Sequence, residues 1–79
     1  MPKIPRLSGK KAIQALTKLG FIAVRQKGSH VVLKKETRDD IFGCVVPLHR
    51  ELAIGTLRGI LRQAKVSPEE FVNALRKVF

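Results

Sequence analysis

Histidine is the residue type in this chain best suited to acid–base chemistry, and one of its two histidines stands in a suggestive context. His30 ends the stretch Q-K-G-S-H and is followed by the apolar residues V-V-L. An imidazole can give or take a proton near neutral pH, and a glycine turn lets a ligand come close to the backbone. A catalytic His30 is therefore one interpretation. A turn residue, a buried structural histidine and a metal ligand are the alternatives.

The alternation of side chains along a strand helps to choose between these interpretations of His30. If residues 30–35 form a strand, Val31 and Leu33 share one face, and His30, Val32 and Lys34 share the other. The first pair is suited to a core. The charged Lys34 therefore indicates that His30 lies on an open face.

Basic residues surround this histidine and dominate the chain. Arg25 and Lys27 precede it and could hold a phosphate, as could Lys34. Sixteen lysines and arginines stand against six acidic residues, which gives a formal net charge of +10. Such an imbalance attracts polyanions, so RNA or DNA is the first partner class expected and an acidic protein is the second.

A metal or cofactor site is not expected. A structural zinc site needs about four ligands, whereas the chain has one cysteine, Cys44, and its Asp39 and Asp40 lack ligand-like spacing to His30 or His49. A lone cysteine among apolar neighbours acts as a small hydrophobe and suits a reducing compartment. No apolar run is long enough for a membrane span, so we expect a cytoplasmic protein without a membrane partner.

Three helices and three strands are expected. Ser8 can cap a first helix that Gly20 would end in a left-handed conformation. Strands are expected at residues 21–25, 30–35 and 41–46 because these runs are rich in β-formers. The apolar faces of the first two helices are Ala12, Ile13, Ala15, Leu16 and Leu19, then Ile54, Leu57, Ile60, Leu61 and Ala64.

The last helix has the clearest start signal. Ser67, Pro68 and Glu70 supply a cap, a proline suited to the first helical position and the second half of a capping box. Gly55 and Gly59 in the preceding helix are expected to allow close packing. The order predicts an α+β domain with helices on one face of a three-stranded antiparallel sheet. Its 79 residues suffice for one domain, 1–79, with a loose lead-in over 1–7 and a terminal helix over 67–79.

Three segments resemble the HicA-type toxins, small mRNA interferases of HicA–HicB toxin–antitoxin modules that are also called YcfA-like. They are L-G-F at 19–21, R-Q-K-G-S-H at 25–30 and V-P-L-H-R-E-L-A-I-G-T-L-R-G-I-L-R-Q-A at 46–64. The resemblance implies a fold like the double-stranded-RNA-binding domain, cleavage of RNA and inhibition by a HicB antitoxin. The family's catalytic histidine falls on His30, Gly28 and Ser29 match the residues before it, and His49 matches a second histidine position.

The expected function is therefore a metal-independent endoribonuclease that acts on single-stranded mRNA and is inhibited by an acidic HicB-type antitoxin. His30 would be the acid or base, with His49 as a possible partner that could equally be a loop cap. Arg25, Lys27, Gly28, Ser29 and Lys34 would bind the RNA. Two rivals remain: a non-catalytic RNA-binding module with the same basic surface, and a domain that only binds an acidic protein.

Overall fold

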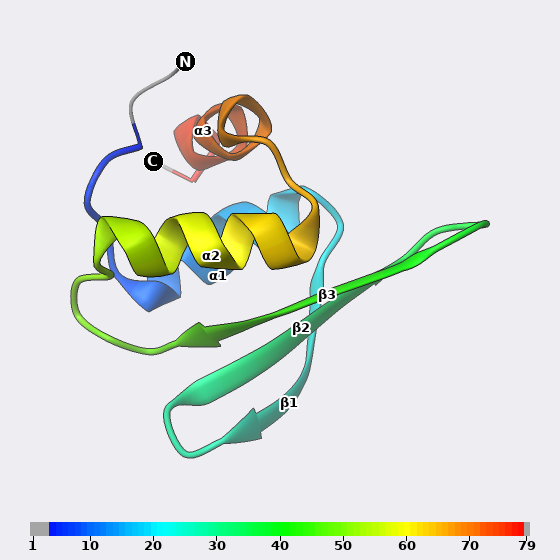
Figure 1. The fold of residues 1–79 in the computed structure, drawn as a ribbon, viewed down its shortest axis with the longest axis horizontal. Helices are drawn as coiled ribbons and strands as arrows, with labels where there is room; N and C mark the ends of the chain where they lie inside the picture. The colour runs from blue at the N-terminus through cyan, green and yellow to red at the C-terminus, as the bar shows by residue number, and fades with distance from the viewer. Residues whose placement is uncertain (1–3, 79) are drawn as a thin grey trace.

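The fold is a three-stranded sheet with all three helices on one side (Figure 1). We analysed a computed structural model that describes residues 4–78. Its elements are α1 (Gly9–Lys18), β1 (Ile22–Lys27), β2 (His30–Glu36), β3 (Ile41–Pro47), α2 (Ile54–Ala64) and α3 (Pro68–Arg76). Helices α1 and α2 lie against the sheet, and α3 packs on these two helices. The strands are antiparallel in the order β1-β2-β3. The α+β class and the α-β-β-β-α-α order of the double-stranded-RNA-binding-like fold are confirmed.

Helix α1 is bounded by the signals that the sequence contains. The Ser8 side chain accepts a hydrogen bond from the Lys11 backbone N–H at 3.1 Å. At the other end Gly20 has φ +99°, and the Phe21 N–H donates to the Leu16 carbonyl at 3.1 Å. A left-handed residue followed by this bond is a Schellman ending. It turns the chain so that Phe21 and Leu16 are both buried.

Helix α3 completes the core. Ser67 and Glu70 form the expected capping box, with both reciprocal hydrogen bonds at 3.1 Å. Phe71 and Leu75 on its inner face are buried, and the helix packs against α1 and α2.

The central strand β2 shows the predicted alternation. Val31 and Leu33 are buried under the helices, whereas His30 and Lys34 are exposed. All six residues of β1 are exposed, because the helices pack against β3 rather than β1. The sheet is therefore covered on one face only, and its β1 side is bare on both faces.

A two-residue turn joins β1 to β2. Lys27 pairs with His30, which leaves Gly28 and Ser29 as the loop. Gly28 has φ +59° while Ser29 does not have a positive φ, which is the sign pattern of a type II′ hairpin turn. The Gln26 side-chain amide donates to the Gly28 carbonyl at 3.0 Å and holds the turn from one side.

The described part of the lead-in is attached to the domain. Leu7 is buried, and its carbonyl accepts a hydrogen bond from the Leu52 N–H at 2.7 Å. Ile4 packs against the core as well. The lead-in expected over residues 1–7 thus has two anchors in its described part, and residues 1–3 lie outside the described residues.

Gly9 brings the start of α1 into close contact with the end of β3. Its N–H donates to the His49 carbonyl at 2.9 Å, and a Cβ at this position would run into the Pro47 carbonyl oxygen. The expectation of close packing at Gly55 and Gly59 is wrong: a Cβ at either would have no neighbour within 4 Å. The packing glycine is at the start of α1, where the helix meets the end of β3.

Replacing Gly9 by alanine should therefore destabilise the protein, although alanine is the better helix former. We expect overpacking against backbone to cost about 1–3 kcal/mol in the free energy of unfolding. The matched control is Gly59→Ala, which has open space and should gain about 0.5–1 kcal/mol. Chemical denaturation of the two variants should shift the midpoint in opposite directions. A Gly9→Ala protein as stable as the wild type would contradict the close contact.

Candidate active site

The strand register defines the outward surface of the sheet. Residues directly opposite one another in adjacent strands share a face. We call this surface the open sheet face. It consists of three rows across β1, β2 and β3: Lys27, His30 and Pro47; Arg25, Val32 and Val45; and Ile22, Lys34 and Gly43. Four of the residues predicted for the site thus lie on one face, which neither composition nor motif could establish.

His30 lies at the end of β2, between Lys27 on one side and Pro47 on the other. The Leu48 N–H donates to the Ser29 carbonyl at 2.7 Å. Because hydrogen-bonded and non-bonded pairs alternate in an antiparallel ladder, His30 and Pro47 form a non-bonded pair, in which side chains are closer. Pro47 therefore costs the ladder no bond, and it flanks the imidazole with a rigid, buried ring.

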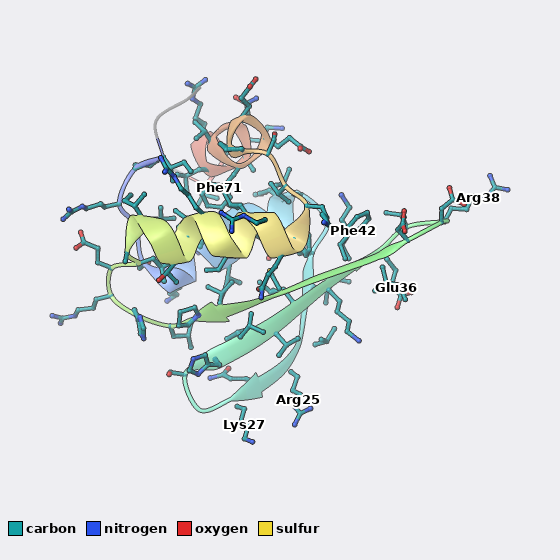
Figure 2. All side chains as sticks on the ribbon, in the orientation of Figure 1. Arg25, Lys27, Glu36, Arg38, Phe42 and Phe71 are labelled. Carbon is teal, nitrogen blue, oxygen red and sulfur yellow. The ribbon has the colours of Figure 1, made fainter. Side chains whose placement is uncertain are left out.

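The cations of the open sheet face are not neutralised. Arg25, Lys27 and Lys34 are exposed, and within residues 4–78 none of them forms an ion pair. Figure 2 shows Arg25 and Lys27 projecting from β1 on the side away from the helices. The row register places Lys27 opposite His30, so a phosphate near the imidazole would meet this ammonium group first.

Gly28 and Ser29 precede His30 in the turn and are exposed. The Ser29 carbonyl accepts a hydrogen bond from the Leu48 N–H, and the Gly28 carbonyl accepts one from the Gln26 side-chain amide. A Cβ at Gly28 would meet nothing within 4 Å, so its positive φ is the structural reason for glycine.

The segment of His49 reaches the same end of the sheet. His49 is exposed and lies two residues beyond Pro47, the partner of His30, and its carbonyl is fixed by the Gly9 N–H. The two histidines therefore lie at the same end of the sheet, and within residues 4–78 no hydrogen bond links their side chains.

The Cys44 side chain lies on the core face of the sheet, opposite the face that carries His30. It pairs with Leu33 on the core face and is buried. Burial raises the pKa of its thiol to about 11, because a thiolate would lose its hydration there. In the part of the chain that the structure describes, no three His, Cys, Asp or Glu side chains are grouped to hold a metal ion.

Sequence reasoning missed three features of this surface. Large apolar side chains are exposed on and beside the sheet: Ile22, Val24, Ile41, Val45 and Leu48. Gln63 of α2 reaches the outer edge of β3, where its Oε1 accepts from the Val45 N–H at 3.5 Å. A β-bulge between Ala23 and Arg25 also went unpredicted. The apolar alternation of β1 is visible in the sequence, but its lack of cover is not.

One known protein family matches most of the chain. A family model described as a HicA toxin of bacterial toxin–antitoxin systems matches residues 9–66, which is more than half of the chain. The chain belongs to the HicA toxin family. The match spans the open sheet face, the β1–β2 turn and α2, and it ends before α3. The HicA resemblance drawn from the sequence is thereby confirmed.

The other two comparisons returned nothing. Neither a curated protein nor a solved structure matches this HicA chain. Within residues 4–78, none of the helices has the length and apolar character that a membrane crossing requires.

Proposed function

We propose that this HicA toxin is an endoribonuclease that cleaves mRNA and uses His30 as its acid–base group. The observation that carries the proposal is the position of His30. It is exposed at the end of β2, directly opposite Lys27 and on the same face as Arg25 and Lys34. An imidazole opposite one unpaired cation, with two more cations farther along the same face, matches the needs of a phosphodiester substrate. The substrate would be met in the cytoplasm, the compartment expected from the sequence.

The proposed chemistry uses the group that distinguishes RNA from DNA. A base removes the proton of a 2′-hydroxyl, whose oxygen then bonds to the adjacent phosphorus. The bond from phosphorus to the 5′-oxygen breaks, and that oxygen takes up a proton. The products are a 2′,3′-cyclic phosphate and a 5′-hydroxyl end. His30 would carry one of the two proton transfers and His49 could carry the other, while Lys27 offsets charge on the phosphoryl oxygens.

Replacing His30 by alanine should separate catalysis from folding. The side chain is exposed, so its truncation opens no cavity and should change stability by less than about 0.5 kcal/mol. Losing a positioned acid–base group should slow cleavage by about 10²–10⁴-fold. The test compares wild type, His30→Ala and His49→Ala on a long single-stranded transcript with chelator present, beside thermal melting and antitoxin pull-down.

Each result has a defined meaning. If His30→Ala still cuts at the wild-type rate, the chemistry lies elsewhere and His49 is the next group to test. Cutting that requires added divalent metal would overturn the metal-independent mechanism. RNA that the wild type binds but leaves intact would favour the rival, a non-catalytic RNA-binding module.

RNA binding by the open sheet face should depend steeply on salt. Each phosphate contact to a single strand contributes about −0.7 to the slope of log affinity against log salt, so Arg25, Lys27 and Lys34 together should contribute roughly −2. Lys34→Gln should make the slope shallower by about 0.7. Lys18→Gln on α1 is the matched control and should leave it unchanged. Equal effects of the two variants would show that RNA does not use this face.

We also propose that a HicB-type antitoxin of acidic character covers the open sheet face. Ile22 is 67% exposed and Val24 53%, beside the cations of β1. Exposed apolar side chains of this size mark interaction surfaces, and uncompensated positive charge favours an acidic partner. Such a partner would occupy the same residues as the RNA and so inhibit cleavage.

Charge reversal should test this docking. Lys27→Glu should slow association with the antitoxin, because steering by opposite charge acts mainly on the association rate. Lys18→Glu carries the same change of charge on a helix and should associate at the wild-type rate. Stopped-flow or surface-binding kinetics at low salt would give both rates. Association slowed equally by both variants would indicate attraction by net charge alone, without docking on this face.

A further inference from the structure

An open depression lies beside His30, at the border of the sheet and α2. Its volume is about 370 Å³, and it is lined by Val32, Lys34, Gly43, Cys44, Val45 and Gln63. Val32, Lys34, Gly43 and Val45 belong to the open sheet face, whereas Gln63 comes from α2. Val32 is two residues beyond His30 on the same side of β2, which is a separation of about 7 Å along a strand.

Two apolar side chains, Val32 and Val45, form the sheet side of the depression. Val32 and Val45 face each other in a non-bonded pair, since Val45 turns its N–H outward to Gln63. Gly43 adds no side chain to the next row, where a Cβ would contact only the Leu33 carbonyl oxygen and the Lys34 Cγ, at 3.5 and 4.0 Å. A planar ring can rest on such a surface, and the Lys34 ammonium group stands beside it for a phosphate.

Gln63 supplies the polar group of the depression. Its Oε1 accepts from the Val45 N–H at 3.5 Å, which orients the amide across the edge of β3. Within residues 4–78 its Nε2 has no hydrogen-bond partner, so two N–H donors and one oxygen lone pair remain available. An amide with free donors beside an apolar floor can read the edge of an unpaired base.

We propose that this depression is a nucleobase subsite and that Gln63 is a residue that determines base preference. It would take the base of a nucleotide adjacent to the scissile phosphate, with Lys34 on the backbone and the ring against Val32 and Val45. The subsite admits only an unpaired base, because the edge that Gln63 reads is occupied in a duplex. This inference rests on the proposed RNA cleavage for its position relative to the cut, although base binding itself does not require cleavage.

The amide-to-carboxylate change gives the sharpest test. A carboxylate only accepts hydrogen bonds, whereas the amide also donates. On the Watson–Crick edge of an unpaired base, guanine presents two adjacent donors, N1–H and the N2 amino group, whereas adenine and cytosine each set one amino donor beside a ring-nitrogen acceptor. Gln63→Glu should therefore raise the affinity for hexamers with a central guanine, relative to the same hexamers with a central adenine, by about tenfold. Gln14→Glu on α1 makes the same charge change away from the sheet and is the matched control.

The binding experiment uses short single-stranded 2′-O-methyl RNA hexamers, which 2′-hydroxyl attack cannot cleave. Nitrogen-15 NMR titration of the wild type should move the signals of the Val45 N–H and the Gln63 side-chain amide, but not that of the Gln14 amide. Affinity ratios are then measured for both glutamate variants. Equal ratios in Gln63→Glu and Gln14→Glu, or an unmoved Gln63 amide, would overturn the subsite.

A cleavage experiment separates this inference from the proposed function. The ends of fragments cut from a long transcript are sequenced for wild type, Gln63→Glu and Gln14→Glu. We expect Gln63→Glu alone to shift the base composition toward guanine at one fixed position beside the cut. Cleavage with an unchanged base composition beside the cut would refute the subsite but would be consistent with the endoribonuclease proposal. A base-dependent shift of the Gln63 amide signal in a protein that cuts no RNA would support the subsite and refute the endoribonuclease proposal.

Discussion

The two-residue periodicity of β2 is the constraint on which the rest of the structure depends. Val31 and Leu33 are buried beneath the helices, and a slip of one residue would exchange them for His30, Val32 and Lys34. Moving an imidazole and an ammonium group into a thin core would leave them without partners, so the register is strongly fixed. Once β2 is set, pairing on both sides places the cations of β1 and the edge of β3 around the histidine. The same burial that stabilises the fold therefore assembles the candidate site.

Because the helices cover only one face of the sheet, an exposed surface remains that could promote self-association and could also bind partners. The bare β1 strand exposes Ile22 and Val24 and leaves an open sheet edge, which in many proteins invites association of identical copies. Here Arg25, Lys27 and a bulge interrupt that edge, and a net charge of +10 makes like molecules repel. A polyanion or an acidic protein meets no such repulsion. One surface thus disfavours self-pairing and favours both partners proposed for a HicA toxin.

Much of the fold was predictable because its signals are local. Ser8 and Gly20 bound α1, and Ser67 begins α3, through hydrogen bonds that span only a few residues. The features that were missed join distant parts of the chain. Gly9 meets the end of β3, and Gln63 contacts Val45 across 18 residues. A glycine at a helix start and a glutamine on a polar helix face look ordinary in sequence, and only the packing of the elements gives them a particular role.

The sequence by itself determined the element order, the alternation of β2, the excess of positive charge and the likeness to HicA toxins, because composition and short-range periodicity specify these properties. The tertiary structure alone decided which residues share the open sheet face. The register across strands aligns Lys27 with His30 and Arg25 with Val32, and the docking of α2 brings Gln63 to the edge of β3. It also decided that β1 lies outside the cover of the helices. Both outcomes arise from long-range packing. The helices are too few to cover the full width of the sheet, so the strand farthest from them, β1, stays exposed.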